Sequence, residues 1–156
     1  MIIALSGGVG GAKLCLGLSR ILPPEELMVV VNTGDDFEHL GFHISPDLDT
    51  VTYTLAGAID PERGWGLVGE TWRAMEALAR YTPARPPASQ AGATWFNLGD
   101  QDLATHLYRT GRITEGAPLS TITAEITAAW GLRQRIVPMT DDPIRTRVLV
   151  GDEWID

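Results

Sequence analysis

The chain has 156 residues, of which 44% are hydrophobic, and a net charge of -8 at pH 7. This length predicts one domain, or one domain with an insertion, large enough to form a core without disulfide bonds. The acidic balance argues against nucleic acid as a partner because contacts to phosphate dominate such binding, and no stretch reaches the roughly 18 apolar residues of a membrane helix.

The single cysteine excludes a disulfide framework and a cysteine zinc site within the chain. The first residues, MIIALSGGVGGAKL, lack the positive start and the long apolar run of a signal peptide. Both observations favour a cytoplasmic protein, in which Cys15 is expected to be a core residue rather than a nucleophile.

Residues 1–44 predict the first β-α-β unit of a nucleotide-binding domain. Residues 1–5 form an apolar run typical of a buried strand, and residues 12–22 carry leucines at spacing four before Pro23, which predicts a helix. Residues 27–32, LMVVVN, form a second apolar run. Unbroken runs of this kind are typical of parallel sheets covered on both faces. We therefore expect an α/β fold with a Rossmann-like parallel sheet.

Residues 45–132 predict a helical insertion. A loop is expected before Ser45, which is a typical helix N-cap followed by Pro46 at the first helical position. The Pro/Ala/Ser-rich segment 82–93 predicts a flexible excursion. The expected helices run from 46 to about 57, from 69 to 80, from about 100 onward, and from 120 to 130.

Residues 133–156 are expected to return to the sheet. Apolar runs at 134–139 and 145–150 indicate two strands, joined through turn-forming residues at 140–143. The order of β-α-β, helices and strands is typical of the α/β class, and the sheet is expected to be incomplete in this chain.

The stretch SGGVGGAKL, residues 6–14, places four glycines between the first strand and the first helix. Glycine lets the backbone approach an anion, and a helix start presents unpaired N–H groups. The pattern favours a phosphate or nucleotide cradle, and the alternative is a tight turn that needs glycine only for geometry. The sequence matches neither the P-loop pattern nor the G-x-G-x-x-G fingerprint, because Lys13 and its neighbours differ from the residues that these patterns require. The predicted phosphate-binding residues are Gly7, Gly8, Gly10, Gly11 and Lys13.

Acidic residues follow the second strand and open the next helix. Asp35 and Asp36 lie where the carboxyl end of a parallel strand commonly meets a ligand. Asp47 and Asp49 lie in the first helical turn, where acids also complement the helix dipole. For Asp47 both interpretations stay open, whereas Asp49 is expected to have a functional role.

A second polar group lies near the helix expected from about residue 100. Asp102, His106 and Arg109 are four and three residues apart, so they share one helix face. This face is either a substrate-facing stripe or, as the spacing alone slightly favours, a solvated side with an ion pair. His39 and His43 do not predict a zinc pair, because the region is expected to be a loop.

Six segments in collinear order resemble the 2-phospho-L-lactate transferase family of deazaflavin coenzyme F-420 biosynthesis. The resemblance implies transfer of a 2-phospholactyl or enolpyruvyl phosphate group from its guanosine diphosphate conjugate. The acceptor would be the ribityl hydroxyl of 7,8-didemethyl-8-hydroxy-5-deazariboflavin, GMP would leave, and Mg2+ would be required. The segments are SGGVGGAKL, VVVNTGDDFEHLG, ISPDLDTVTYTLAG, GWGLVGETW, LGDQDLATHLYRT and PMTDDPIRTRV.

The resemblance also implies roles for particular residues. Asp49, the second aspartate of PDLD, would contact the deazaflavin and act in catalysis, and Asp35 and Asp36 would hold Mg2+. Substrate binding is also expected from Asp100, Gln101 and Arg109. Gln101 stands where the family usually has arginine, which removes a charge but keeps a hydrogen bond; Arg109 is a candidate substitute.

Family members continue well beyond the point that corresponds to residue 156, so the chain resembles their N-terminal half. An exposed sheet edge is expected to favour self-association, most simply as a homodimer. The first alternative function is a non-catalytic nucleotide- or deazaflavin-binding half-domain. An NAD-dependent oxidoreductase domain is disfavoured by the failed dinucleotide fingerprint.

Overall fold

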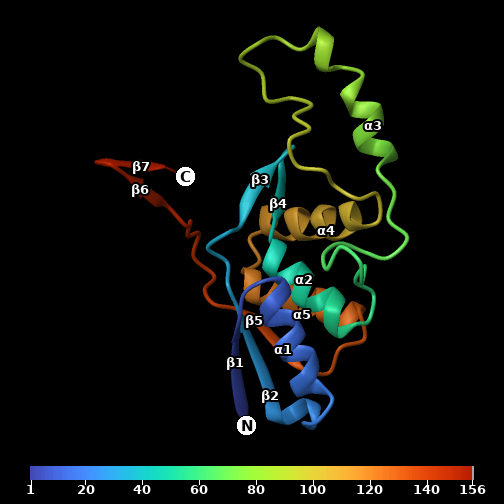
Figure 1. Cartoon of the computed structure of the whole chain (residues 1–156), viewed down its shortest axis with the longest axis vertical. Helices are drawn as coiled ribbons and strands as arrows, with labels where there is room; N and C mark the ends of the chain where they lie inside the picture. Colours follow the sequence, from blue (N-terminus) through green and yellow to red (C-terminus); the bar gives the residue numbers. More distant parts are fainter. Residues whose placement is uncertain (156) are drawn as a thin grey trace.

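The computed structural model describes residues 1–155, and at its centre this part of the chain forms a three-stranded parallel sheet (Figure 1). The strand order is β1 (Ile2–Ser6), β2 (Leu27–Val31) and β5 (Arg135–Pro138). Both neighbouring pairs are parallel. The predicted α/β class with a parallel sheet is therefore confirmed.

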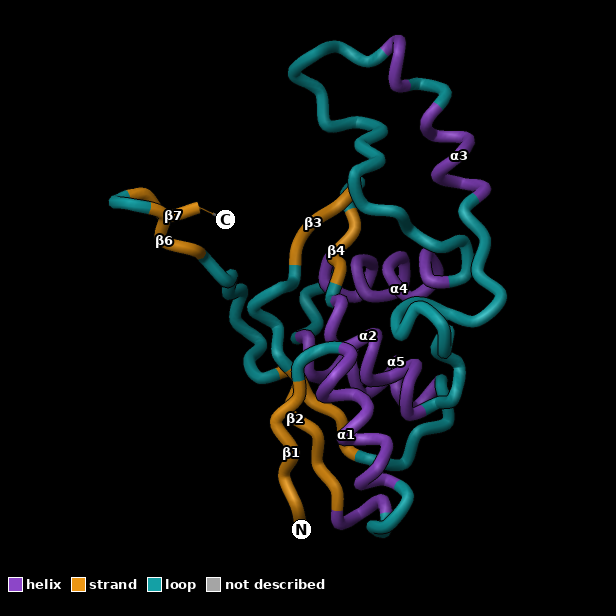
Figure 2. Tube along the Cα trace, in the orientation of Figure 1, coloured by secondary structure: helices purple, strands orange, loops and turns teal. Residues whose placement is uncertain are grey.

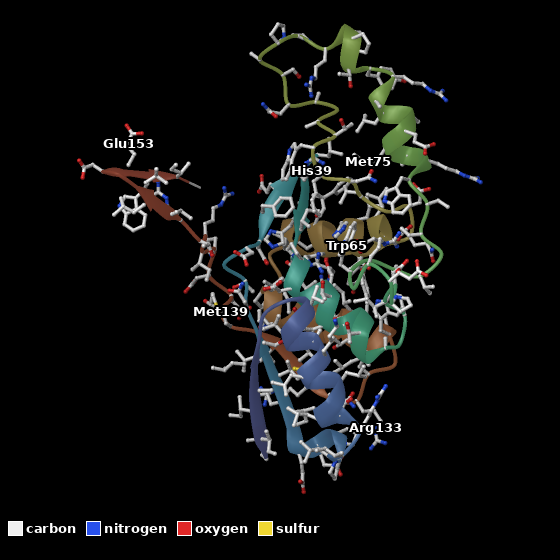
Figure 3. All side chains as sticks on the ribbon, in the orientation of Figure 1. His39, Trp65, Met75, Arg133, Met139 and Glu153 are labelled. Carbon is white, nitrogen blue, oxygen red and sulfur yellow. The ribbon has the colours of Figure 1, made fainter. Side chains whose placement is uncertain are left out.

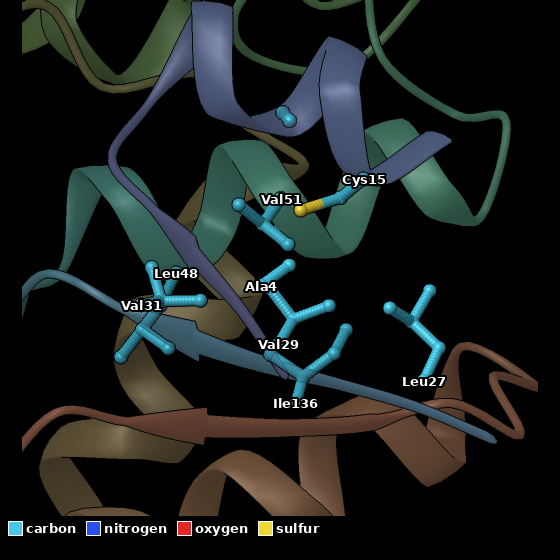
Figure 4. Close-up of a cluster of buried hydrophobic side chains, with 9 residues drawn as sticks. Ala4, Cys15, Leu27, Val29, Val31, Leu48, Val51 and Ile136 are labelled. Carbon is cyan, nitrogen blue, oxygen red and sulfur yellow. The ribbon is translucent and has the colours of Figure 1, made fainter. Parts of the chain in front are cut away.

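Two helices near the start of the chain cover the sheet and enclose its core. Helices α1 (Val9–Ser19) and α2 (Pro46–Leu55) pack on each other, and a 3-10 turn at Pro24–Glu26 leads from α1 into β2. Figure 4 shows Cys15 of α1 and Val51 of α2 lying over the sheet. The buried cluster consists of Ala4, Ala12, Cys15, Leu27, Val29, Val31, Leu48, Val51 and Ile136.

Strand β1 differs from its prediction as a buried strand. It lies at the edge of the sheet, where Ile3 is 55% and Leu5 is 78% exposed. Helix α1 also begins earlier than predicted and turns Leu14 outward, while Ala12 and Cys15 face the core. The buried stripe of α1 is therefore built from small residues. Self-association through the free edge of β1 stays a prediction.

The segment before α2, predicted as a loop, contains a β-hairpin. Strands β3 (Phe37–His39) and β4 (Phe42–Ile44) pair in antiparallel fashion. Leu40 and Gly41 form the turn with φ values of 54° and 80°. Such a two-residue turn with positive φ at both positions suits a hairpin, but leucine at the first position gives a weak sequence signal.

The other helices begin close to their predicted positions. Helix α2 follows Ser45 as its N-cap, as expected, and α4 (Asp102–Thr114) packs on β4. Helix α5 (Leu119–Ala129) packs on β5, so the range 45–132 supplies covering helices of the sheet as well as inserted structure. No helix within residues 1–155 is long and apolar enough to cross a membrane.

The upper part of the molecule in Figure 2 is an arm made of α3 (Arg73–Ala79) and the chain that follows it. Helix α3 is shorter than the predicted 69–80, because Gly69 has a positive φ of 70° and ends any helical continuation there. A 3-10 turn at Thr82–Ala84 opens the segment 82–93. A second core cluster, built on Ile44, Met75 and Leu98, joins the arm to the hairpin.

The last segment corrects the prediction that both of its strands return to the sheet. Only β5 does so within the described part of the chain. Strands β6 (Val148–Val150) and β7 (Glu153–Ile155) form their own antiparallel hairpin, which projects away from the body in Figure 1. The turn between them includes Gly151 at φ 64°, which lets the two strands pair locally. Asp156, the end of the predicted segment 133–156, lies outside the described residues.

Candidate functional site

The glycine-rich loop after β1 lies against a carboxylate of α2. A Cβ atom added at Gly8 would stand 2.6 Å from Asp47 Oδ1, and one at Gly7 would stand 3.6 Å from Asp47 Oδ2. Glycine is needed at position 11 for a different reason, since a Cβ atom there would stand 3.1 Å from the Cα atom of Ser6. Close approach therefore requires Gly8, whereas Gly11 serves the packing of α1 on β1.

Two predicted phosphate-binding residues lie farther along α1. A Cβ atom at Gly10 would meet no other atom within 4 Å, so this position is open to solvent. Lys13 is exposed on the same helix and makes no hydrogen bond or ion pair within residues 1–155. Helix α1 receives no side-chain cap at its N-terminus, so its first N–H groups are available to an anion.

A cluster of acids surrounds Asn32 at the carboxyl end of β2. The Asn32 side-chain amide donates to Asp35 Oδ2 and to Asp47 Oδ2, each at 3.0 Å. Burial raises the pKa of Asp47, and the charges of Asp35 and Asp36 raise it further. One amide thus holds two carboxylates that repel each other, which is an arrangement that a cation would stabilise.

Asp36 points to the hairpin and not to this pair. Its Oδ2 accepts a hydrogen bond from Ser45 Oγ at 2.6 Å and lies 3.1 Å from His43 Nε2. Its Oδ1 is buried and has no hydrogen-bond partner among the described residues. The structure therefore places Asp35 with Asp47, a residue whose role the sequence left open, and separates Asp36 from them.

Asp49 and Arg109, which the sequence predicted to bind the acceptor, come from different helices and meet in the protein interior. Arg109 of α4 donates from both terminal nitrogens to the carboxylate of Asp49 on α2, with one distance of 3.2 Å. Asp49 is 5% and Arg109 is 2% exposed. Burial raises the pKa of Asp49, and the Arg109 charge opposes that rise. The interpretation of Arg109 as part of a solvated helix side is therefore wrong.

A buried polar network continues from this ion pair. His106 Nδ1 lies 3.3 Å from an Arg109 nitrogen, and His106 Nε2 lies 3.3 Å from Asp102 Oδ2. The Tyr53 hydroxyl lies 2.5 Å from Asp102 Oδ1, and burial raises the pKa of Tyr53. Among residues 1–155, ligand atoms of Asp49, Asp102 and His106 fall within 4.8 Å of one another. The four oxygens of Asp49 and Asp102 each face a partner, so we interpret the group as an internal network, in which the buried His106 Nε2 makes no hydrogen bond within residues 1–155.

Asp100 and Gln101 lie where the chain enters α4, and the carboxylates of Asp100 and Glu70 form a pair of reciprocal caps on α3 and α4. Asp100 accepts hydrogen bonds from the backbone N–H groups that start α3, and from Thr71 Oγ1 at 2.5 Å. The Thr71 hydrogen bond is the largest cause that lowers the pKa of Asp100. Glu70 in turn accepts from the N–H groups of Gln101 and Asp102 at 2.7 and 3.1 Å. These contacts give Asp100 a structural role, whereas the Gln101 side chain is exposed.

A small pocket of about 140 Å³ borders this network. Asp49, Tyr53 and His106 line its polar side, and the aromatic rings of Trp65 and Phe96 line the rest. Figure 3 labels Trp65 beside the helices of the body. Polar groups that converge beside aromatic walls are typical of small-molecule sites.

Sequence reasoning missed several residues of this region. Asn32 and Tyr53 stand within the family-like segments VVVNTGDDFEHLG and ISPDLDTVTYTLAG, but neither was given a role of its own. Glu70 acts on a helix that begins more than 30 residues later. Trp65 and Glu70 both stand within GWGLVGETW, so the family-like segments were the available signal.

Comparisons with known proteins point to one enzyme family. The family model described as 2-phospho-L-lactate transferase CofD matches residues 2–155. A phosphoenolpyruvate transferase of Nocardia farcinica is 48% identical over 97% of this chain and 43% of its own length. The enzymes of that name from Streptomyces coelicolor and Mycobacterium tuberculosis are 45% and 43% identical, over 96% and 97% of this chain and 44% and 47% of their own length.

The chain thus spans less than half the length of these curated relatives. The matched residues 2–155 nevertheless include the glycine loop, the acids around Asn32 and the Asp49 network. The chain belongs to the 2-phospho-L-lactate transferase CofD family.

Proposed function

We propose that this chain carries donor-phosphate and acceptor sites of a transferase in deazaflavin coenzyme biosynthesis. The reaction moves a 2-phospholactyl or enolpyruvyl phosphate group from its guanosine diphosphate conjugate to the ribityl hydroxyl of 7,8-didemethyl-8-hydroxy-5-deazariboflavin. The names of the curated relatives favour the enolpyruvyl donor. The family match supports the reaction class.

One observation carries the proposal: the first turn of α2 touches both sites. Asp47 lies against Gly8 of the phosphate loop, and Asp49, two residues later, lines the small pocket. A donor held at the loop and an acceptor held at the pocket would therefore be neighbours. Phosphoryl-type transfer depends chiefly on such positioning and on charge stabilisation.

The donor would bind at the start of α1. Backbone N–H groups from Gly7 to Gly11 would donate to its diphosphate, with Lys13 on the same helix. The acceptor oxygen would form a new bond to the phosphorus that carries the small acid, and the bond to the GMP oxygen would break. The hydroxyl proton would pass to the phosphate oxygen of the leaving GMP, so the two substrates would yield one phosphodiester and GMP.

The residues at Asn32 fit Mg2+, because this ion is commonly held by one or two carboxylates together with substrate phosphates. Asp35 and Asp47 share one amide donor, and burial together with the neighbouring acids raises the pKa of Asp47. We assign these two carboxylates to the ion, with Asp36, also expected as a ligand, held by Ser45 and His43. Bound there, the ion would offset charge on the donor phosphates.

Asp49 would orient the ribityl hydroxyl through a hydrogen bond. Its carboxylate lines the pocket while Arg109 holds it in a single orientation from the opposite side. The buried network behind it, from His106 to Tyr53, would keep that orientation when the substrate arrives. Arg109 would therefore act on the substrate through Asp49, and Gln101 would contact the acceptor from the surface.

A second candidate function follows from the length of the chain. Because it spans less than half of its curated relatives, the 156 residues alone would bind guanine nucleotide and deazaflavin without completing the transfer. An NAD-dependent oxidoreductase is a weaker candidate, since the glycine pattern departs from the dinucleotide fingerprint.

Calorimetry with GDP, with and without Mg2+, and with deazaflavin tests the binding sites directly. We expect both to bind, GDP more tightly with Mg2+, and NAD not to bind. Failure of GDP and deazaflavin to bind would contradict the proposal. A turnover assay that detects GMP and the phosphodiester then separates the complete transferase from the binding-only candidate.

A further inference from the structure

The loop 58–68 between α2 and α3 is tightly built. Ile59 and Leu67 form a β-bridge across it, so its two ends are held side by side. The carboxylate of Asp60 accepts from the backbone N–H of Arg63 at 3.0 Å and forms an ion pair with the Arg63 guanidinium at 3.0 Å. Such a loop holds its side chains in defined positions without belonging to a helix or strand.

Arg63 fixes the tryptophan at the tip of this loop. Its guanidinium carbon lies 5.4 Å from the ring centre of Trp65 and 4.9 Å from that of Trp72. The same guanidinium donates to the carbonyl oxygen of Leu67 at 3.0 Å. Trp72 packs against the second core cluster. Arg63 thus connects the exposed Trp65 to the core through two cation-π contacts and two polar contacts.

Trp65 stands at the rim of the small pocket. It is 47% exposed and lines the same pocket as Phe96 and Asp49. The neighbouring Gly64 lies beside the phosphate loop, since a Cβ atom there would stand 3.2 Å from a methyl carbon of Val9. The loop therefore lies next to both substrate sites of the proposed function.

We propose that the indole of Trp65 stacks on the ring system of the deazaflavin, and that Arg63 is a positioning residue that holds the indole for this contact. The inference rests on the proposed function. Exposed aromatic surface is unfavourable in water. A flat aromatic ligand that stacks on the indole removes this surface from water, which stabilises the complex.

The size of the pocket indicates which part of the acceptor lies inside it and which part lies outside. A volume of about 140 Å³ admits the ribityl chain but not a three-ring heterocycle. The ribityl hydroxyls therefore enter toward Asp49, and the rings remain outside against Trp65. The indole thus selects for a flat aromatic group at the position that places the chain in the pocket.

Deazaflavin binding to the full 156-residue chain tests both residues, because the ligand absorbs at longer wavelengths than any side chain. We expect Trp65→Ala to raise the deazaflavin Kd about tenfold or more and to abolish the shift of the ligand's absorption band that stacking produces. Trp65→Phe retains most of the affinity with a smaller shift. Arg63→Met raises the Kd several-fold, and Arg63→Lys, which keeps the charge but not the planar group, raises it less.

Matched controls are Trp154→Ala on the β7 hairpin and Arg80→Met after α3, and both are expected to leave the deazaflavin and GDP Kd values unchanged. Equal deazaflavin affinity and an equal band shift in Trp65→Ala and the wild type would overturn this inference while the proposed function stands. If Arg63→Met weakened GDP binding as much as deazaflavin binding, Arg63 would belong to the fold, and its positioning role would be overturned. Absence of deazaflavin binding by the wild type would overturn the acceptor site and, with it, this inference.

Discussion

Arg109 on α4 holds both carboxylate oxygens of Asp49 on α2, across 60 residues of sequence and almost out of contact with water. This ion pair joins two helices that the sequence does not connect. It also places a full positive charge beside Asp49, since the pKa of Arg109 is raised: burial lowers it, but Asp49 raises it more. Removal of either partner would leave a buried charge alone.

Replacement of Arg109 by methionine is therefore expected to lower the free energy of unfolding by about 3–5 kcal/mol, because Asp49 would stay buried without its partner. Urea denaturation measures this difference. Arg112→Met is the control, since Arg112 pairs with Glu125 at the surface and should change stability little. If Arg109→Met lowered the free energy of unfolding no more than Arg112→Met does, the buried pair would not be important for stability.

The double substitution Asp49→Leu with Arg109→Met should separate stability from binding. Two apolar side chains replace the two charges, so the double variant is expected to recover most of the stability that Arg109→Met alone loses. Without Asp49 it should no longer bind deazaflavin, while GDP binding persists. Asp49→Asn, in contrast, is expected to lose stability as well as transfer, because Arg109 keeps its charge. Deazaflavin affinity in the double variant equal to that of the wild type would remove Asp49 from the acceptor site.

Two glycines of the phosphate loop offer a matched comparison. Alanine at Gly8 would place its Cβ 2.6 Å from Asp47 Oδ1, whereas alanine at Gly10 would meet nothing within 4 Å. We expect Gly8→Ala to weaken GDP binding about tenfold or more, since a shift of Asp47 or of the loop costs on the order of 1–3 kcal/mol. Gly10→Ala keeps the backbone N–H and should bind GDP nearly as the wild type does. Calorimetry that gave equal Kd values for both variants would refute the cradle.

Asp47→Asn should stabilise the ligand-free protein and weaken its response to Mg2+. Burial raises the pKa of Asp47 above its ordinary 3.8, so the folded state binds this proton more tightly than the unfolded state. The wild type therefore loses stability as the pH rises through that window, and asparagine does not. The stability difference should grow from about pH 4 upward and be complete above the raised pKa. Melting temperatures across the pH range, and GDP titrations with and without Mg2+, measure the two effects; a less stable variant at neutral pH would contradict this account.

Asp100→Ala should lower the melting temperature by a few degrees through loss of the cap on α3. Hydrogen bonds from Thr71 and from the backbone of α3 lower the pKa of Asp100, so its contribution is present above pH 3.8 and disappears as the pH falls through the lowered pKa. The difference between variant and wild type should shrink in acid. Glu62→Ala, an exposed carboxylate without a partner within residues 1–155, is the control. An equal effect of both substitutions would show that the cap contributes nothing.

Local patterns predicted most of the secondary structure. Ser45 followed by Pro46 marks the start of α2 because proline suits the first helical position, while the Ser45 hydroxyl donates to Asp36 and does not cap the helix. The run LMVVVN forms β2 because its side chains suit a sheet. Where prediction failed, long-range contacts decided. Strand β1 lies at an edge, and β6 pairs with β7, since its turn lets the two strands satisfy their backbone groups locally.

The sequence by itself determined the α/β order of elements, the glycine-dense loop between the first strand and helix, and the membership of the chain in its family. The first two are written in adjacent residues, and the third in six short segments in collinear order. Only the tertiary structure decided which acids meet: Asp35 with Asp47 at one amide, Asp36 with Ser45, and Asp49 with Arg109 in the interior. The physical reason is that charge pairing and burial depend on distance through space, and the spacing of residues along a chain does not encode that distance once the chain leaves a single helix or strand.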